Sequence, residues 1–344
     1  MLLSSCQLDP FGNLNSRVVM AAMTRGFAGE GHVATDEMAE YYGRRAEAGI
    51  GLILTEGTIV DVSGDGYNGV PHIGNQVQAE SWKQVVDRVH AAKARIFSQL
   101  WHCGRISHSD YTGGEAPVSS TNRAAEGHNR QNDKPFGKPR ALTLDEIPLI
   151  YEMFLQAARN AMIAGFNGVQ IHMGHGYLVD QFFDGRINDR KDLYGGSVAN
   201  RCRFALELLE VVIAELGADK VAIRISPSRF MGEIYDWPDL DEMLAYLIPS
   251  LDKLGLRILD ISCANADYFE TSGRVIKKVR PHWQGLILGG ASLSLEQAER
   301  EICDGNLDLV TWGRYILANP DFVLRLSGGR NIEPFDPSML ATLN

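Results

Sequence analysis

The sequence predicts an α/β fold: a single (β/α)8 TIM barrel spanning residues 1–344, with a long loop or hairpin cap after the third strand. Two observations lead to this fold class. Short apolar runs alternate with longer amphipathic stretches, and most runs are apolar at nearly every position, as strands covered on both faces are. Eight such repeats favour right-handed βαβ units that close into a barrel.

The eight predicted strands are spread along the whole chain, and no linker or low-complexity tract divides it into domains. We place them at residues 17–23, 51–57, 95–101, 168–173, 221–226, 258–262, 285–290 and 307–313.

Amphipathic segments between these strands predict helices at residues 36–48, 80–94, 144–164, 198–216, 239–254 and 294–303. Thr35 is a suitable N-cap for the first of them. Thr143 is followed three residues later by Glu146, which is the spacing of a capping box. Gly217 and Gly255 are suited to end the fourth and fifth helices.

The connection after the third strand, residues 104–140, breaks this rhythm because it is polar and rich in Gly, Pro, Asn and charge. Connections of this length are usually functional. Since it follows the C-terminal end of a strand, we expect it to cover the mouth of the barrel.

Composition and cysteine usage disfavour several classes of protein. The formal charge of −10 disfavours non-specific binding to nucleic acid or anionic membranes. Five scattered cysteines form no C-x-x-C pair, so we expect no metal site and a reducing, cytoplasmic location. The first residues lack the basic region of a signal peptide. No apolar run approaches the roughly 20 residues that span a bilayer.

Polar and glycine residues gather at the predicted C-terminal strand ends, which converge on the active site of a barrel. A polar residue in an apolar strand costs stability unless it is satisfied, so several at one end indicate a shared ligand. They are Met23–Thr24, Glu56–Gly57, Gln99, Trp101, His172, His175, Tyr177, Arg224, Gly289–Gly290 and Gly313–Arg314.

The glycines after the seventh and eighth strands indicate a phosphate group. Gly289–Gly290 and Gly313–Arg314 stand where barrels of this type usually bind phosphate. Glycine lets backbone N–H groups approach a ligand closely, and Arg314 adds a bidentate partner for phosphate oxygens. The alternative is that these glycines only form tight turns.

Gln99 and Arg224 suit the edge of a flavin ring, because an amide both donates and accepts and a buried arginine compensates negative charge. Alternatively, Arg224 pairs with a carboxylate such as Asp260 to stabilise the barrel. Two neutral imidazoles, His172 and His175, can donate to one substrate oxygen. Tyr177 stays protonated at neutral pH and can act as an acid.

With these residues the sequence resembles the Old Yellow Enzyme family of FMN-dependent ene-reductases over nearly its whole length. Seven ordered blocks carry the resemblance: RVVMAAMTR (17–25), YYGRRAEAGIGLILTEGT (41–58), SQLWHCGRISH (98–108), PRALTLDEI (139–147), AGFNGVQIHMGHGYLVDQFF (164–183), INDRKDLYGGSVANRCRF (187–204) and GRYILANPDFVLRL (313–326).

The resemblance implies a non-covalent FMN, reduced by NADH or NADPH, and an activated alkene as the second substrate. It implies that His172 and His175 bind the substrate oxygen, that Tyr177 supplies the proton and that Trp101 lines the substrate pocket. It also implies flavin contacts from Ala22, Met23, Thr24, Gly57, Gln99, His172 and Arg224, and phosphate contacts from Gly289, Gly290, Gly313 and Arg314.

The chain departs from the family at three points. Many members have proline at Ala22, so we expect a softer turn here. Many have asparagine at His175 while others have histidine, and we expect this difference to shift ligand preference rather than abolish activity. Longer relatives carry a C-terminal iron–sulfur motif, and because this chain ends at Asn344 without one, we expect it to lie outside that branch.

Other functions stay open at this stage. A barrel aldolase or isomerase also binds phosphate, but strands four to six offer no lysine at their C-terminal ends. A flavin-binding protein without turnover would have no use for His172, His175 and Tyr177. Oxygen or a nitrate ester is an alternative acceptor. The physiological substrate, the nicotinamide preference and the choice between monomer and homo-oligomer have no readable signal.

Overall fold

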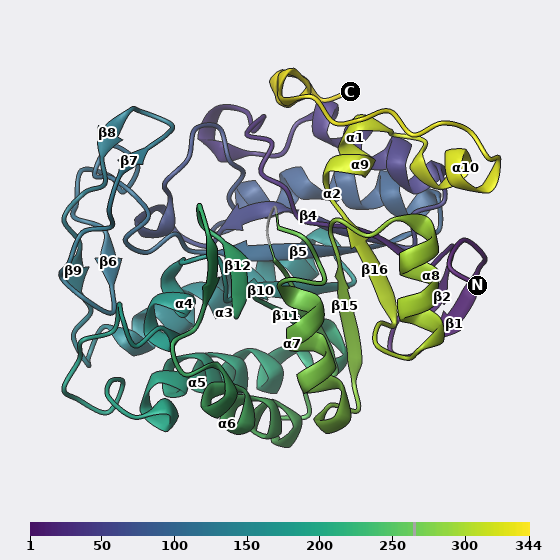
Figure 1. Cartoon of the computed structure of the whole chain (residues 1–344). Helices are drawn as coiled ribbons and strands as arrows, with labels where there is room; N and C mark the ends of the chain where they lie inside the picture. Colours follow the sequence, from purple (N-terminus) through teal and green to yellow (C-terminus); the bar gives the residue numbers. More distant parts are fainter. Residues whose placement is uncertain (264–265) are drawn as a thin grey trace.

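The computed structural model, which describes residues 1–263 and 266–344, is a closed barrel of eight parallel strands (Figure 1). Around the barrel the strands run β3, β4, β5, β10, β11, β14, β15 and β16. Their bounds are Val18–Met20, Leu52–Ile59, Arg95–Trp101, Gly168–His172, Val221–Ile225, Ile258–Ile261, Leu286–Gly290 and Leu309–Trp312. The predicted fold class and all eight predicted strands are therefore confirmed.

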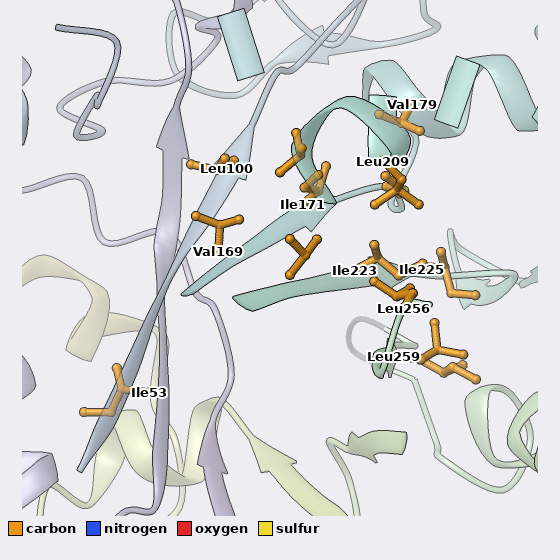
Figure 2. Close-up of a cluster of buried hydrophobic side chains, with 14 of the residues drawn as sticks. Ile53, Leu100, Val169, Ile171, Val179, Leu209, Ile223, Ile225, Leu256 and Leu259 are labelled. Atoms are coloured by element: carbon orange, nitrogen blue, oxygen red, sulfur yellow. The ribbon is translucent and has the colours of Figure 1, made fainter. Parts of the chain in front are cut away.

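Alternate residues of each strand face opposite sides of the barrel wall. One apolar cluster fills the interior and takes residues from most strands, among them Leu52, Leu54, Phe97 and Ala222. The residues between them join a second, larger cluster with the surrounding helices. Figure 2 shows this outer cluster, in which Ile223 of β11 lies near Leu209.

A hairpin that was not predicted contributes to the interior. Strands β1 (Cys6–Leu8) and β2 (Gly12–Leu14) pair antiparallel near the N-terminus. Phe11, in the turn between them, lies edge-to-face with Phe97 of the barrel at a centroid distance of 5.6 Å. Leu14 joins the same interior cluster. The hairpin thus closes one end of the barrel with apolar side chains.

Helices cover the outside of the barrel. They are α1 (Asp36–Glu47), α2 (Gln76–Ala91), α3 (Ile147–Ala164), α4 (Leu178–Phe183), α5 (Val198–Leu216), α6 (Leu240–Lys253), α7 (Ser272–Val279), α8 (Leu295–Cys303), α9 (Arg314–Ala318) and α10 (Phe322–Ser327). Helices α4, α7, α9 and α10 were not predicted. No helix in the described part of the chain is long and apolar enough to cross a membrane.

Two predicted helix starts were wrong. Helix α2 begins at Gln76 rather than at residue 80, because Asn75 and Gln78 form a reciprocal capping box. Helix α3 begins at Ile147 rather than at residue 144, since the Thr143 hydroxyl donates to Glu146 instead of capping a helical N–H.

Residues 104–140 form the predicted cap, seen at one side of the barrel in Figure 1. Within it lie the short strands β6 (Val118–Ser119), β7 (His128–Asn129) and β8 (Lys134–Pro135), and β9 (Arg140–Ala141) follows. Strand β6 pairs with β9, and β7 with β8. A further hairpin, β12 (Ser228–Phe230) and β13 (Ile234–Asp236), follows β11.

The start of α2 is open to a direct test. We expect Asn75→Ala to lower the free energy of unfolding by about 1 kcal/mol, the usual cost of a lost N-cap. The matched control is Gln76→Ala, because Gln76 is an exposed residue one position later. Urea denaturation and hydrogen exchange at the Gln78 amide measure the effect. Equal stability of the two variants would contradict the capping box.

Candidate active site

Above the apolar interior, the barrel carries a chain of polar side chains. Gln99 Nε2 donates to Gln170 Oε1 at 2.6 Å, and Gln170 Nε2 donates to Asp260 Oδ2 at 3.1 Å. Arg224 Nε lies 3.5 Å from Asp260 Oδ2, and Arg224 Nη2 donates to Ser262 Oγ at 2.7 Å. The pairing of Arg224 with Asp260 is therefore present, and Arg224 also lines a cavity. Its contact with a flavin stays a prediction.

Two cavities lie at this end of the barrel. The larger of these two, of about 220 Å³, opens at the C-terminal ends of the last strands. Predicted residues that line it are Ala22, Met23, His175, Arg224, Gly290, Gly313 and Arg314. Arg314 is exposed and its guanidinium lies 5.2 Å from the Phe335 ring centroid. This cavity therefore combines two arginines with bare backbone, which suits an anion.

A smaller cavity of about 90 Å³ adjoins the larger one, because Ala22, His175 and Arg224 line both. Its lining includes the other predicted residues of the site: Thr24, Gly57, Gln99, Trp101, His172 and Tyr177. The ends of five strands thus contribute to the smaller cavity, and the larger cavity adds residues from β15 and β16.

The glycines differ in their orientation. A Cβ on Gly290 would lie 2.5 Å from Thr311 O, and one on Gly313 would lie 2.6 Å from Met23 Sδ. A Cβ on Gly289 would instead meet Ile276 and Leu307, outside the barrel, and Gly289 does not line either cavity. A Cβ on Gly57 would lie 2.2 Å from Trp101, so this glycine makes room for the indole.

His172 and His175 are neutral. Burial lowers the pKa of each well below 6.5, and Arg224 lowers both further. The Gly174 N–H donates to His172 Nδ1 at 3.3 Å, which leaves Nε2 as the protonated nitrogen of the neutral ring. His175 Nε2 lies 3.2 Å from Ser262 Oγ, and the two imidazoles stand nearly perpendicular at 87°. The pair can therefore hydrogen bond to a neutral polar ligand without adding charge.

Tyr177 lies in an aromatic group with Trp101, His172 and Tyr67. Its ring centroid is 4.8 Å from that of Trp101 and 5.1 Å from that of His172. Its hydroxyl oxygen lies 2.7 Å from that of Tyr67. Burial raises the pKa of Tyr177 well above 10, so this hydroxyl keeps its proton at neutral pH.

Helix α4, which follows Tyr177 directly, fixes the loop that carries His175 and Tyr177. Asp180 accepts the Gly176 N–H at 2.6 Å and pairs with Arg229 at 2.9 Å. Gln181 donates to Gly176 O at 2.8 Å and accepts from Ser119 Oγ of the cap at 2.8 Å. This loop, which holds His175 at a φ of 57°, is therefore secured from both sides.

The loop that carries Thr24 is held by a buried carboxylate. Glu56 Oε2 accepts the backbone N–H groups of Arg25 and Gly26, each at 2.9 Å. Burial raises the pKa of Glu56 to about 7, although these two N–H donors oppose the shift. The position of Thr24 at the cavity thus depends on a carboxyl group that titrates near neutral pH.

Sequence reasoning missed several residues of this site. Gln170 was detectable, because it stands two positions before His172 and therefore on the same side of the strand. Asp180 and Gln181 lie on a helix that was not predicted. Tyr67 stands in a loop about 35 residues before Trp101 and had no signal of its own.

Comparisons with known proteins agree with this geometry. The model of the NADH:flavin oxidoreductase / NADH oxidase family matches residues 7–333. A protein named 12-oxophytodienoate reductase 7, from Oryza sativa subsp. japonica, is 40% identical over 96% of this chain and 89% of its own. Another, 12-oxophytodienoate reductase 2 from Arabidopsis thaliana, is 36% identical over 96% of this chain and 89% of its own.

A solved structure is also similar. The old yellow enzyme homologue from Zymomonas mobilis superimposes with a TM-score of 0.91 and is 32% identical. The match covers 98% of this chain and 96% of that one. The likeness therefore includes the barrel together with its cap and hairpins.

The raised pKa of Glu56 predicts a pH-dependent stability. Below pH 4.5 the carboxyl is protonated in both states, and between pH 4.5 and about 7 only the folded state keeps the proton. The free energy of unfolding should therefore fall as pH rises through this window, by at most about 3 kcal/mol. Glu56→Gln, which keeps an acceptor oxygen, should remove that part of the slope in denaturation at pH 5 and pH 8. An unchanged slope would contradict the assignment.

Proposed function

The chain belongs to the NADH:flavin oxidoreductase / NADH oxidase family, and from that premise we propose how its site reduces the activated C=C bond of an α,β-unsaturated carbonyl or nitro compound. The protein is an NAD(P)H-dependent FMN oxidoreductase of the Old Yellow Enzyme type. The observation that carries the proposal is that Arg314, Arg224, His172 and Tyr177 line two adjoining cavities, with Arg224 common to both.

The residues of both cavities fit FMN. Arg314 and the backbone at Gly290 and Gly313 would hold the phosphate, because all three residues line the larger cavity. Arg224 Nε is buried and makes no hydrogen bond within residues 1–263 and 266–344. Arg224 and Gln99 would therefore contact the polar edge of the ring, with Met23, Thr24 and Gly57 beside it. Gly289 lines neither cavity, so its predicted contact with the phosphate has less support than that of Gly290.

The histidines bind the oxygen of the alkene substrate in this proposal. When bound, FMN supplies the two-electron chemistry, taking hydride from a nicotinamide and giving it to the alkene. His172 donates from Nε2, and His175 exchanges its contact with Ser262 for the substrate. Two neutral donors in a buried site stabilise the negative charge that develops on this oxygen. Trp101 packs against the substrate.

Tyr177 donates the proton to the carbon next to the carbonyl or nitro group. Its place beside His172, at a ring distance of 5.1 Å, supports this role. The buried hydroxyl is protonated at neutral pH because burial raises its pKa. Tyr177 therefore acts as the general acid.

Reductant, location and acceptor class are also proposals. Either NADH or NADPH serves as the hydride source. All five cysteines are free, which supports a reducing cytoplasm. A nitrate ester or oxygen would be served by the same site. A Schiff-base aldolase is disfavoured, because the described residues that line the two cavities include no lysine.

The role of Tyr177 predicts unequal effects on the two half-reactions. We expect Tyr177→Phe to slow alkene reduction by about 10²- to 10⁴-fold, the usual contribution of a general acid. Flavin reduction by NAD(P)H should stay near the wild-type rate. Stopped-flow absorbance with cyclohexenone separates the two steps. Equal losses in both would remove Tyr177 from this role, and a wild-type enzyme that leaves cyclohexenone unreduced would contradict the proposed function.

The histidine pair predicts the loss of ligand binding. A double variant, His172→Ala and His175→Ala, should bind a phenol about 100-fold more weakly, because each lost hydrogen bond costs about 1 to 1.5 kcal/mol. The charge-transfer band of the phenol complex should disappear, with flavin content unchanged. His282→Ala, which alters an exposed histidine, is the control. Retained phenol affinity in the double variant would disprove the oxygen site.

A further inference from the structure

We propose that Tyr67 passes its proton to Tyr177 as Tyr177 protonates the alkene, and that solvent in an outer cavity beneath the cap then replaces the Tyr67 proton. This inference rests on the proposed function, because it takes Tyr177 as the proton donor to the alkene. It assigns a role to a residue outside the two cavities described above.

The first observation is the direct contact between the two phenols. Their hydroxyl oxygens lie 2.7 Å apart, a normal length for an O–H···O hydrogen bond. The Tyr67 ring also packs on Trp101 at a centroid distance of 4.8 Å. Burial raises the pKa of Tyr67 to about 12, so it too keeps its proton at neutral pH. Each of the two hydroxyl groups therefore carries a proton, and the two are hydrogen bonded to each other.

The second observation is that Tyr67, which contacts Tyr177, lines a cavity that is separate from the two site cavities. An outer cavity of about 560 Å³ lies against the cap, and Tyr67 lines it. Its other lining residues are Ile106, Glu126, Gly127, His128, Asn129, Arg130, Gln131 and Phe136. Tyr177 lines the smaller cavity of the site and does not line the outer one. Tyr67 thus stands between the donor and a polar, open space.

The third observation is that the loop of Tyr67 is firmly held. Asp65 Oδ1 accepts the N–H groups of Gly66 and Tyr67, at 2.6 and 3.1 Å. Asp65 Oδ2 lies 3.0 Å from His72 Nε2, and the His72 ring stacks on His32 at 3.9 Å. These three side chains are close enough together to hold a metal ion, but their contacts already orient the loop.

The proposed transfer balances in protons and electrons. The electron pair of the enolate forms the new C–H bond with the Tyr177 proton, and the Tyr177 O–H bond breaks. In the same step the Tyr67 proton moves to the Tyr177 oxygen, and a water in the outer cavity then gives its proton to the Tyr67 oxygen and leaves as hydroxide. Since Tyr67 donates to Tyr177 as negative charge forms there, it also stabilises that charge.

Tyr67→Phe removes this hydroxyl and keeps the packing on Trp101. We expect alkene reduction to slow roughly 10- to 100-fold, as for the loss of a hydrogen bond to a charged group. Flavin reduction by NAD(P)H should be unchanged. The matched control is Tyr111→Phe, because the Tyr111 hydroxyl donates to Asn68 on the same loop at 2.9 Å and does not contact Tyr177. The control should reduce alkenes at the wild-type rate.

Two further measurements separate a relay from mere packing. We would measure the rate of alkene reduction in H₂O–D₂O mixtures and plot it against the deuterium fraction. In the wild type the plot should be curved, since two protons move. In Tyr67→Phe it should be linear. In protein labelled with ¹³Cζ-tyrosine, the Tyr177 resonance should shift in Tyr67→Phe and stay in place in Tyr111→Phe.

An unshifted Tyr177 resonance, an unchanged alkene rate, equal losses in both half-reactions or a curve retained in Tyr67→Phe would each overturn the relay. These results are distinct from a failure of the proposed function, in which the wild-type enzyme itself would not reduce the alkene.

Discussion

The site depends on one constraint, which is that a charged Arg224 is held inside the barrel wall. Asp260 on the neighbouring strand β14 forms an ion pair with Arg224. Gln170 on β10 donates to Asp260, and Gln99 on β5 donates to Gln170. A buried charge is tolerated only when it is paired and hydrogen bonded. These partners come from strands that are distant in sequence, so the row of polar contacts forms only when the barrel is closed.

This arrangement also sets the charge of the site. Arg224 and burial together keep His172 and His175 neutral, so Arg224 and Arg314 are the cations that face the larger cavity among its described lining residues. In the proposed function, an anionic cofactor meets the positive charge of the larger cavity, while the alkene meets the uncharged donors of the smaller one.

The cap and the catalytic loop form one hydrogen-bonded unit. Gln181 joins Gly176 to Ser119, and Asn129 donates to Gly66 O beside Tyr67. The cap is therefore hydrogen bonded, directly or through Gln181, to the loops that carry Tyr67 and Tyr177. None of the described residues that line the two site cavities comes from the cap, so the cap acts on the site through the loops to which it is hydrogen bonded.

The sequence by itself determined the strands, the barrel and most residues of the site, because buried parallel strands are apolar at nearly every position and their C-terminal ends converge. It misplaced the start of α2, where Asn75 offered a better cap than the periodicity suggested. Only the tertiary structure decided that Gly290 lines the larger cavity while Gly289 does not, and that Tyr67 contacts Tyr177. Local patterns record burial and periodicity, whereas a contact between residues 110 positions apart depends on how the whole chain folds.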